Sequence, residues 1–199
     1  LFVPKGAERS HKLIALGTSV ATAVLGIVAF AGFDYDRAKD LQYVADTAWI
    51  PRLGSRFIVG VDGISLPLIA LTLLVVPLVL LYSWDHIPAP GNPKAFLSLI
   101  LVLETGMIGT FVAQDLILFF VFFEVVLLPM YFMIGVWGGP ERQYAAIKFF
   151  LFTLFGSALM IVSFIALYFL SDPQTFDMRA LPQAATAISS GAAIWIFGG

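Results

Sequence analysis

The chain has 199 residues, of which 60% are hydrophobic, 15% aromatic and only 12% charged. A soluble domain carries about 25% charged and about 45–50% apolar residues, so a mean hydropathy of +0.95 excludes an ordinary water-soluble enzyme. The low charge also excludes a disordered chain, and a formal net charge of -2 offers no basic face for a nucleic acid. An integral membrane protein remains.

The residues that usually hold cofactors are scarce. The chain has no cysteine, which excludes disulfides, thiolate zinc sites and iron–sulfur ligation. Its two histidines, His11 and His86, fall in polar connectors between apolar runs, so we expect no haem held by a histidine pair inside the membrane. We therefore expect no cofactor and no metal in this chain, and a chemistry of ions or protons.

The apolar residues fall in runs long enough to span a bilayer, which takes roughly 20 helical residues. The sequence predicts an all-α, polytopic transmembrane bundle that forms a single domain over 1–199. Its expected spans are 13–33, 63–84, 95–113, 116–137 and 144–170, with a partial sixth span over 184–199. Most connectors are short, so neighbouring helices should be antiparallel.

One connector, 34–62, is long and rich in charged residues, so it should lie outside the membrane as a loop. Within it, residues 56–61 alternate weakly between apolar and other side chains, which favours a short strand or hairpin. Asp62 stands where it could cap the following helix.

The two ends of the chain are unusual for a membrane protein. The sequence begins at Leu1 without an initiator methionine, and it ends at Gly199 inside an apolar run that is too short to span. A helix that stopped there would leave its last carbonyls unsatisfied in lipid. We therefore expect an internal piece of a longer protein.

Glu124 is the most informative residue, because it lies in the apolar run FFVFFEVVLLPMYF. A charge in mid-helix is unfavourable by about 2.5–3.5 kcal/mol on insertion scales, so such a residue normally faces a bundle interior or water. Pro129 follows five positions later and removes the backbone hydrogen bond to the Val125 carbonyl. We expect a polar spot there. The alternative is a carboxylate that a neighbouring helix satisfies without any mechanistic role.

Glu104 and Glu124 are equally distant from the turn at 114–115, so a tight antiparallel hairpin places them at similar depth. Two acids in one apolar site cannot both ionise easily, so one of them would hold a proton, as in a proton relay. The two helices could also turn these residues apart.

Lys148 is the third ionisable candidate. It lies about four residues into its predicted helix, where a lysine can extend to the interface and have no further role. It also lies on the opposite side of the membrane from the 113–115 turn, which disfavours a direct pair with Glu124. Gly106, Gly109, Gly156 and Ser157 should permit close approach of helices.

The stretch from Gln114 to Lys148, together with WIPRLGSRFIVGVDGISLPL at 49–68 and LETGMIGTFVAQD at 103–115, resembles the antiporter-like, proton-translocating membrane subunits of respiratory complex I. Within that family the similarity is greatest to the M or chain 4 type of NADH-quinone oxidoreductase. Subunits of multisubunit cation/proton antiporters are similar as well.

The resemblance implies a longer bundle built on inverted repeats, with this sequence starting after the first helix and ending within the seventh. It maps the family's membrane glutamate onto Glu124, and Lys148 onto the lysine of an AAIKFF motif. The lysine that pairs with this glutamate would lie beyond Gly199.

The resemblance further implies an enzyme subunit without a redox centre of its own, in a multi-pass position in the bacterial inner (plasma) membrane. Its partners would be the antiporter-like neighbours and the long lateral helix of complex I, with NADH and quinone bound by other subunits. Two alternatives stay open, namely a subunit of a cation/proton antiporter and a non-conducting membrane scaffold.

Overall fold

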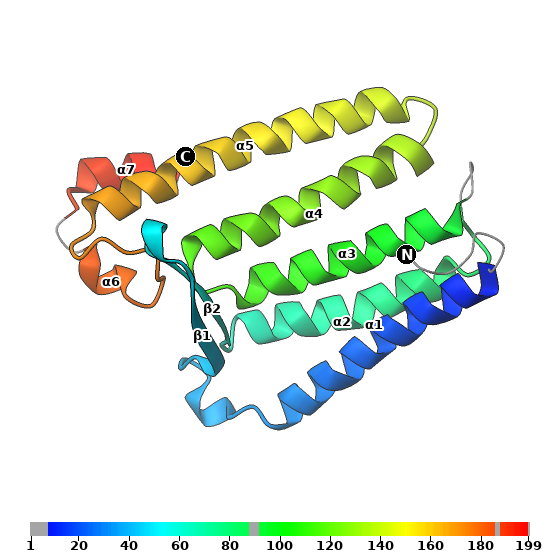
Figure 1. Cartoon of the computed structure of the whole chain (residues 1–199), viewed down its shortest axis with the longest axis horizontal. Coiled ribbons are helices and arrows are strands. Elements are labelled where there is room, and N and C mark those ends of the chain that lie inside the picture. Colours follow the sequence, from blue (N-terminus) through cyan, green and yellow to red (C-terminus); the bar gives the residue numbers. More distant parts are fainter. Residues whose placement is uncertain (1–7, 88–91, 186–187, 199) are drawn as a thin grey trace.

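The computed structural model describes residues 8–87, 92–185 and 188–198, and it is mostly helical. The long helices are α1 (Glu8–Ala31), α2 (Ser65–Tyr82), α3 (Pro93–Val112), α4 (Leu116–Trp137) and α5 (Arg142–Leu170). These five are long and apolar enough to cross a membrane, which confirms the predicted fold class. They run side by side, with the connecting elements gathered at the two ends (Figure 1).

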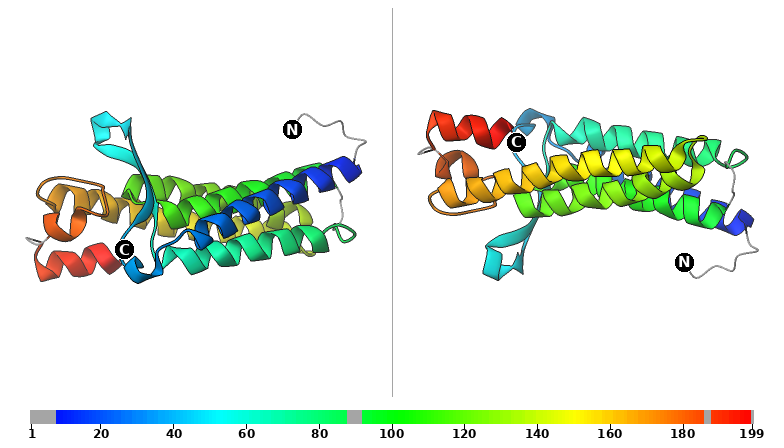
Figure 2. Two further views of the ribbon diagram at one scale, coloured as in Figure 1. Left: turned by 90° about the horizontal axis from the view of Figure 1, so that it is seen from below. Right: turned by 90° about the horizontal axis from the view of Figure 1, so that it is seen from above.

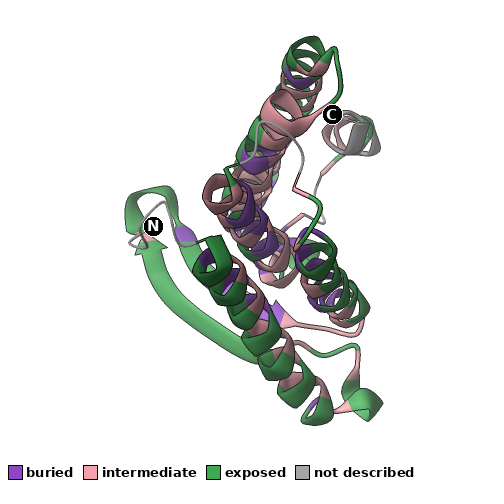
Figure 3. Ribbon diagram, turned by 90° about the vertical axis from the view of Figure 1, so that its right-hand side faces the viewer, coloured by how far each residue is buried: buried purple, intermediate pink, exposed green. Residues whose placement is uncertain are grey.

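The helices form a three-membered cluster with a two-helix extension. α1, α2 and α3 all pack against one another, whereas α4 packs on α3 and α5 packs on α4. The apolar core of the cluster is shared by all three of its helices and contains Ala15, Val76, Leu80, Phe96, Leu97 and Ile100. Seen nearly end-on, buried residues lie where helices face each other, while the outer faces are exposed (Figure 3). This is the distribution expected of helices whose outer faces contact lipid or other subunits.

The start of α1 differs from the sequence prediction. The helix begins at Glu8, ahead of the expected start of the span at 13, so His11 lies in its first turns and not in a connector. The His11 side chain is buried, 7% exposed. The interpretation of His11 as a connector residue was wrong because the charged residues Glu8, Arg9 and Lys12 are themselves helical.

The connector 34–62 folds into an antiparallel hairpin of β1 (Gln42–Ile50) and β2 (Ser55–Val61), flanked by the short 3-10 helices η1 (Tyr35–Arg37) and η2 (Pro51–Leu53). Of the two options predicted from residues 56–61, a short strand or a hairpin, the structure has the hairpin, although the bounds of β1 were not predicted. The hairpin lies across one end of the helices and projects sideways from them (Figure 2). Asp62 accepts hydrogen bonds from the amides of Ile64 and Ser65 ahead of α2, at 3.1 and 2.8 Å.

The chain after α5 lies at the same end of the helices as the β-hairpin. A loop leads to α6 (Leu181–Ala184), and α7 (Ser190–Gly198) packs along α5. Of the partial sixth span predicted over 184–199, Ala184 is the last residue of α6 and Ser190–Gly198 form α7, while residues 186, 187 and 199 lie outside the described residues. Leu116, Phe176 and Leu181 form a small core that joins this loop to the start of α4.

Candidate proton site in the membrane helices

The turn between α3 and α4 is held in place from two sides. Its Gln114 amide donates to the Ile58 carbonyl of β2 at 2.9 Å. On the other side, the Gln114 carbonyl accepts from the Met178 amide at 3.0 Å, and the Leu116 amide donates to the Phe176 carbonyl at 3.0 Å. The turn is therefore hydrogen-bonded both to the β-hairpin and to the loop after α5.

Asp115 is the centre of this arrangement and is fully buried, 0% exposed. Its Oδ1 accepts hydrogen bonds from the Ser55 hydroxyl at 2.9 Å and from the amides of Ile117 and Leu118 at 3.0 and 3.1 Å. Its Oδ2 accepts from the Arg56 amide at 3.1 Å. One carboxylate thus caps α4 and ties it to β2.

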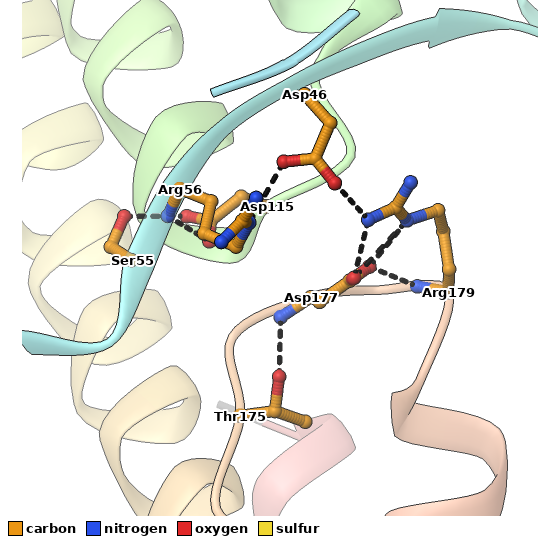
Figure 4. A network of polar contacts seen from close by, with 7 residues as sticks. All are labelled: Asp46, Ser55, Arg56, Asp115, Thr175, Asp177 and Arg179. Carbon is orange, nitrogen blue, oxygen red and sulfur yellow. Dashed lines mark hydrogen bonds and ion pairs between the residues drawn. The ribbon is translucent and has the colours of Figure 1, made fainter. Parts of the chain in front are cut away.

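An ion-pair network lies beside Asp115 on the outer surface (Figure 4). Asp46 of β1 accepts from Arg56 and from Arg179, each at 2.8 Å, and Arg179 also pairs with Asp177 at 2.7 Å. Hydrogen bonds from Arg179 and Arg56 hold the pKa of Asp46 below its usual value of 3.8. The network joins the hairpin to the loop that follows α5.

The two glycines of α3 set the rotation of the α3–α4 hairpin. A Cβ atom added at Gly109 would come within 2.2 Å of the Phe122 ring, and one at Gly106 within 2.8 Å of Val126 Cγ2. The expected close approach at these glycines is confirmed. Among the described residues Gly156 has no such neighbour, since a Cβ there would meet nothing within 4 Å.

This packing places Glu124 on the side of α4 that faces away from α3. Glu124 lies two residues from Phe122 and two from Val126, which is about 200° around the helix from each. The side chain is half-buried, and its Oε1 is buried without a hydrogen-bond partner among the described residues. A buried carboxyl oxygen without a partner is rare in folded proteins and marks a position where a proton, water or cation belongs.

Glu104 faces away from α4 in turn. It is 4% exposed, and its Oε1 accepts a hydrogen bond from the Ser19 hydroxyl of α1 at 3.0 Å. Because Gly109 lies opposite Phe122 and Gly106 opposite Val126, Glu104 and Glu124 differ in depth by about one helical turn. The structure therefore resolves the open question from the sequence: the helices turn the two carboxyls to opposite sides of the hairpin.

Lys148 is not brought to either carboxyl. It is exposed on α5, and its Nζ lies 5.7 Å from the centre of the Tyr144 ring, a cation–π distance. A Cβ atom added at Gly135 would lie 3.4 Å from the Ala146 Cβ, and the ring centres of Tyr131 and Phe150 are 5.3 Å apart. Lys148 thus lies about 13 Å along the helix axes from the level of Glu124.

Among the described residues, no group of three or more His, Asp or Glu side chains could hold a metal ion. The residue that sequence reasoning missed is Ser19. Its only sequence signal is a hydroxyl in an apolar helix, and Thr18 and Thr22 share that signal.

Five apolar helices that could span a membrane, with two separately placed acids between them, are the architecture of a polytopic membrane subunit. Residues 48–110 match the family described as NADH-ubiquinone oxidoreductase chain 4, amino terminus, and residues 113–198 match the family described as NADH:quinone oxidoreductase/Mrp antiporter, TM. The chain belongs to this family of antiporter-like membrane subunits and is a multi-pass membrane protein.

Individual relatives agree with the family assignment. The chain is 44% identical over 165 residues to NADH-quinone oxidoreductase subunit M of Rhodobacter capsulatus, which covers 83% of this chain and 31% of that protein. It thus spans about a third of the length of the curated relatives it matches.

Two solved structures share the fold. A chain of respiratory complex I from Thermus thermophilus with bound NADH matches with a TM-score of 0.79 and 27% identity, over 94% of this chain and 37% of that one. A chain of the Mrp complex from a Dietzia species matches with a TM-score of 0.79 and 17% identity, over 96% and 20% of the two chains. At that identity the second likeness shows the fold alone.

Proposed function

We propose that this chain is part of a proton-translocating subunit of NADH:quinone oxidoreductase in the bacterial plasma membrane. Redox energy released in other subunits, which bind NADH and quinone, would drive proton movement here. The observation that carries the proposal is the buried, unpartnered oxygen of Glu124 in a chain similar to subunit M.

The chemistry follows from the surroundings of that carboxyl. A cation that approaches Glu124 favours its charged form and releases a proton, and withdrawal of the cation favours the protonated form. Glu124 lies on the side of α4 that also carries Tyr131 and Gly135, which face Phe150 and Ala146 of α5, and its buried Oε1 has no partner among the described residues. Lys148 is too far along α5 to serve, so the cation would come from another helix of the full-length subunit.

Glu104 would bind a proton on the other side of the hairpin, between α1 and α3. Its separation from Glu124 supports two protonation sites in series or in parallel, in place of one shared site. The partners of the subunit would be neighbouring antiporter-like chains and the lateral helix of the complex.

The test is Glu124→Gln in the full-length subunit, in membrane vesicles that oxidise NADH. We expect assembly without proton transport, because the amide fills the same space but carries no titratable proton. Glu141→Gln is the matched control, since Glu141 is an exposed acid at the turn before α5. An unchanged number of protons moved per NADH in Glu124→Gln would contradict the proposal.

A second candidate function is cation/proton exchange without redox coupling, which the description of the matched family as NADH:quinone oxidoreductase/Mrp antiporter favours. Purification of the native assembly separates the two. Flavin and iron–sulfur subunits that copurify support the redox-driven function, whereas cation-dependent proton exchange in their absence supports the antiporter. A purely structural scaffold predicts that Glu124→Gln is fully active while Glu124→Ala fails to assemble.

A further inference from the structure

Ser19 differs from the other hydroxyl residues of the spanning helices in where its hydrogen bond goes. A serine or threonine in a helix commonly donates to a carbonyl of its own helix about one turn earlier. The hydroxyls that do so here are those of Thr18, Thr22, Thr72, Thr105, Thr110, Thr153, Ser157 and Ser163. Ser19 instead donates to a carboxyl group on a different helix.

The Ser19–Glu104 pair is enclosed. Ser19 is 0% exposed and Glu104 is 4% exposed, so water has little access to either side chain. One turn away along each helix, Ala15 of α1 and Ile100 of α3 belong to the same apolar core. In such surroundings a carboxyl depends on the few polar groups that reach it, and here one of these groups is the Ser19 hydroxyl.

We infer that Ser19 is a positioning residue for proton binding by Glu104. This inference rests on the proposed function, since it concerns how one of the two acids holds its proton. A hydroxyl has one donor and two acceptor positions, so it can serve both forms of the acid. It donates to Glu104 in the charged form, which is the bond in the structure.

In the protonated form the roles reverse. The carboxyl O–H of Glu104 donates to Ser19 Oγ, and the Ser19 hydrogen turns to the Ala15 carbonyl, one turn earlier on α1. Thr18 makes the equivalent bond to the Ile14 carbonyl at 2.8 Å. A rotation about one side-chain bond thus keeps the carboxyl oriented toward α1 in both states, away from Glu124.

The test uses the full-length subunit in its complex, with infrared spectroscopy of the Glu104 carboxyl band. That band is identified as the one that disappears in Glu104→Gln. In Ser19→Ala and Ser19→Cys we expect the band to move, because alanine has no donor and a thiol is a weak one. The hydrogen bond to the charged form is the stronger of the two, so loss of both should change the proton-binding constant of Glu104 roughly fivefold.

Two controls separate positioning from packing. Thr18→Ala removes an exposed hydroxyl from the neighbouring position and should leave the band in place. Ser19→Thr keeps the hydroxyl and should give the band at its original position. Ser19→Cys is close to serine in volume, so it still tests the inference if Ser19→Ala fails to assemble.

Transport gives an independent readout. If Ser19 acts through Glu104, the double variant Ser19→Ala/Glu104→Gln should transport protons as Glu104→Gln alone does. An unmoved band in Ser19→Ala and Ser19→Cys, or a double variant with additive losses, would overturn the inference. The band position does not depend on transport, so normal transport in Glu124→Gln would reject the proposed function without touching the Ser19–Glu104 pair.

Discussion

Substitution of Asp115 tests how the start of α4 is attached to the β-hairpin of β1 and β2. In Asp115→Ala, α4 loses its N-cap, a change of about 1 kcal/mol. The buried Ser55 hydroxyl and the Arg56 amide also lose their acceptor, and each unpaired group adds about 1 kcal/mol or more. Together these losses amount to about 3–4 kcal/mol, so local opening should become at least a hundredfold more frequent.

Asp115→Asn separates the two tasks of this side chain. Its remaining oxygen can stay at the Oδ1 position, where it accepts from the Ile117 and Leu118 amides. The amide nitrogen then replaces Oδ2 and faces the Arg56 amide, donor against donor. We expect the start of α4 to stay protected and the Ser55 hydroxyl to keep its bond to Oδ1, while the bond from the Arg56 amide is lost.

Hydrogen–deuterium exchange of the full-length subunit in nanodiscs measures both sites. In Asp115→Ala the amides of Leu118 and Arg56 should both lose protection, and in Asp115→Asn only that of Arg56. Asp40→Ala, which removes an exposed acid from the connector 34–62, is the control. Equal loss at both amides in Asp115→Asn, or retained protection in Asp115→Ala, would refute the reasoning.

Three further outcomes are expected. Gly109→Ala should destabilise the α3–α4 pair by about 1–3 kcal/mol because its methyl group meets the Phe122 ring, whereas Gly156→Ala should not, and thermal denaturation compares them. Since the pKa of Asp46 is lowered, its contribution to the stability of the β-hairpin is present above about pH 4 and is lost as the pH falls further. Amide exchange in β1 should therefore rise in acid, and this rise should be much weaker in Arg179→Ala. Glu104→Gln combined with Glu124→Asp should give additive losses of proton transport, because the two carboxyls face opposite sides of the hairpin, and synergy would show a shared site.

The sequence predicted five long apolar helices because each span needs a long apolar run, and Glu124 was a candidate because a charge inside such a run is conspicuous. From their equal distance to the turn it placed Glu104 and Glu124 at similar depth, whereas the structure sets them about one helical turn apart. It could not predict their rotation, which depends on how Gly106 and Gly109 receive Val126 and Phe122. Approximate depth follows from counting residues, whereas direction follows from packing between helices.

Other features were invisible for physical reasons. Most of β1 is exposed, so it lacks the alternation of buried and exposed residues by which a strand is recognised. Ser19 resembles its neighbours in composition, and only the position of α3 shows which hydroxyl reaches a carboxyl. The role of Asp115 also needed the structure, since its four donors come from β2 and α4.

The clamped turn at 113–116 has a mechanical consequence when it is combined with Pro129. The first part of α4 is anchored through Asp115, and Pro129 interrupts its hydrogen-bond ladder nearer the other end. Proline is the usual place for a helix to bend, and a tilt of about 10° there would carry Trp137 by about 2 Å. Glu124 lies between Asp115 and Pro129, in the anchored part of α4. In the proposed function, the Glu124 carboxyl would therefore keep its position while the groups that exchange its proton move relative to it.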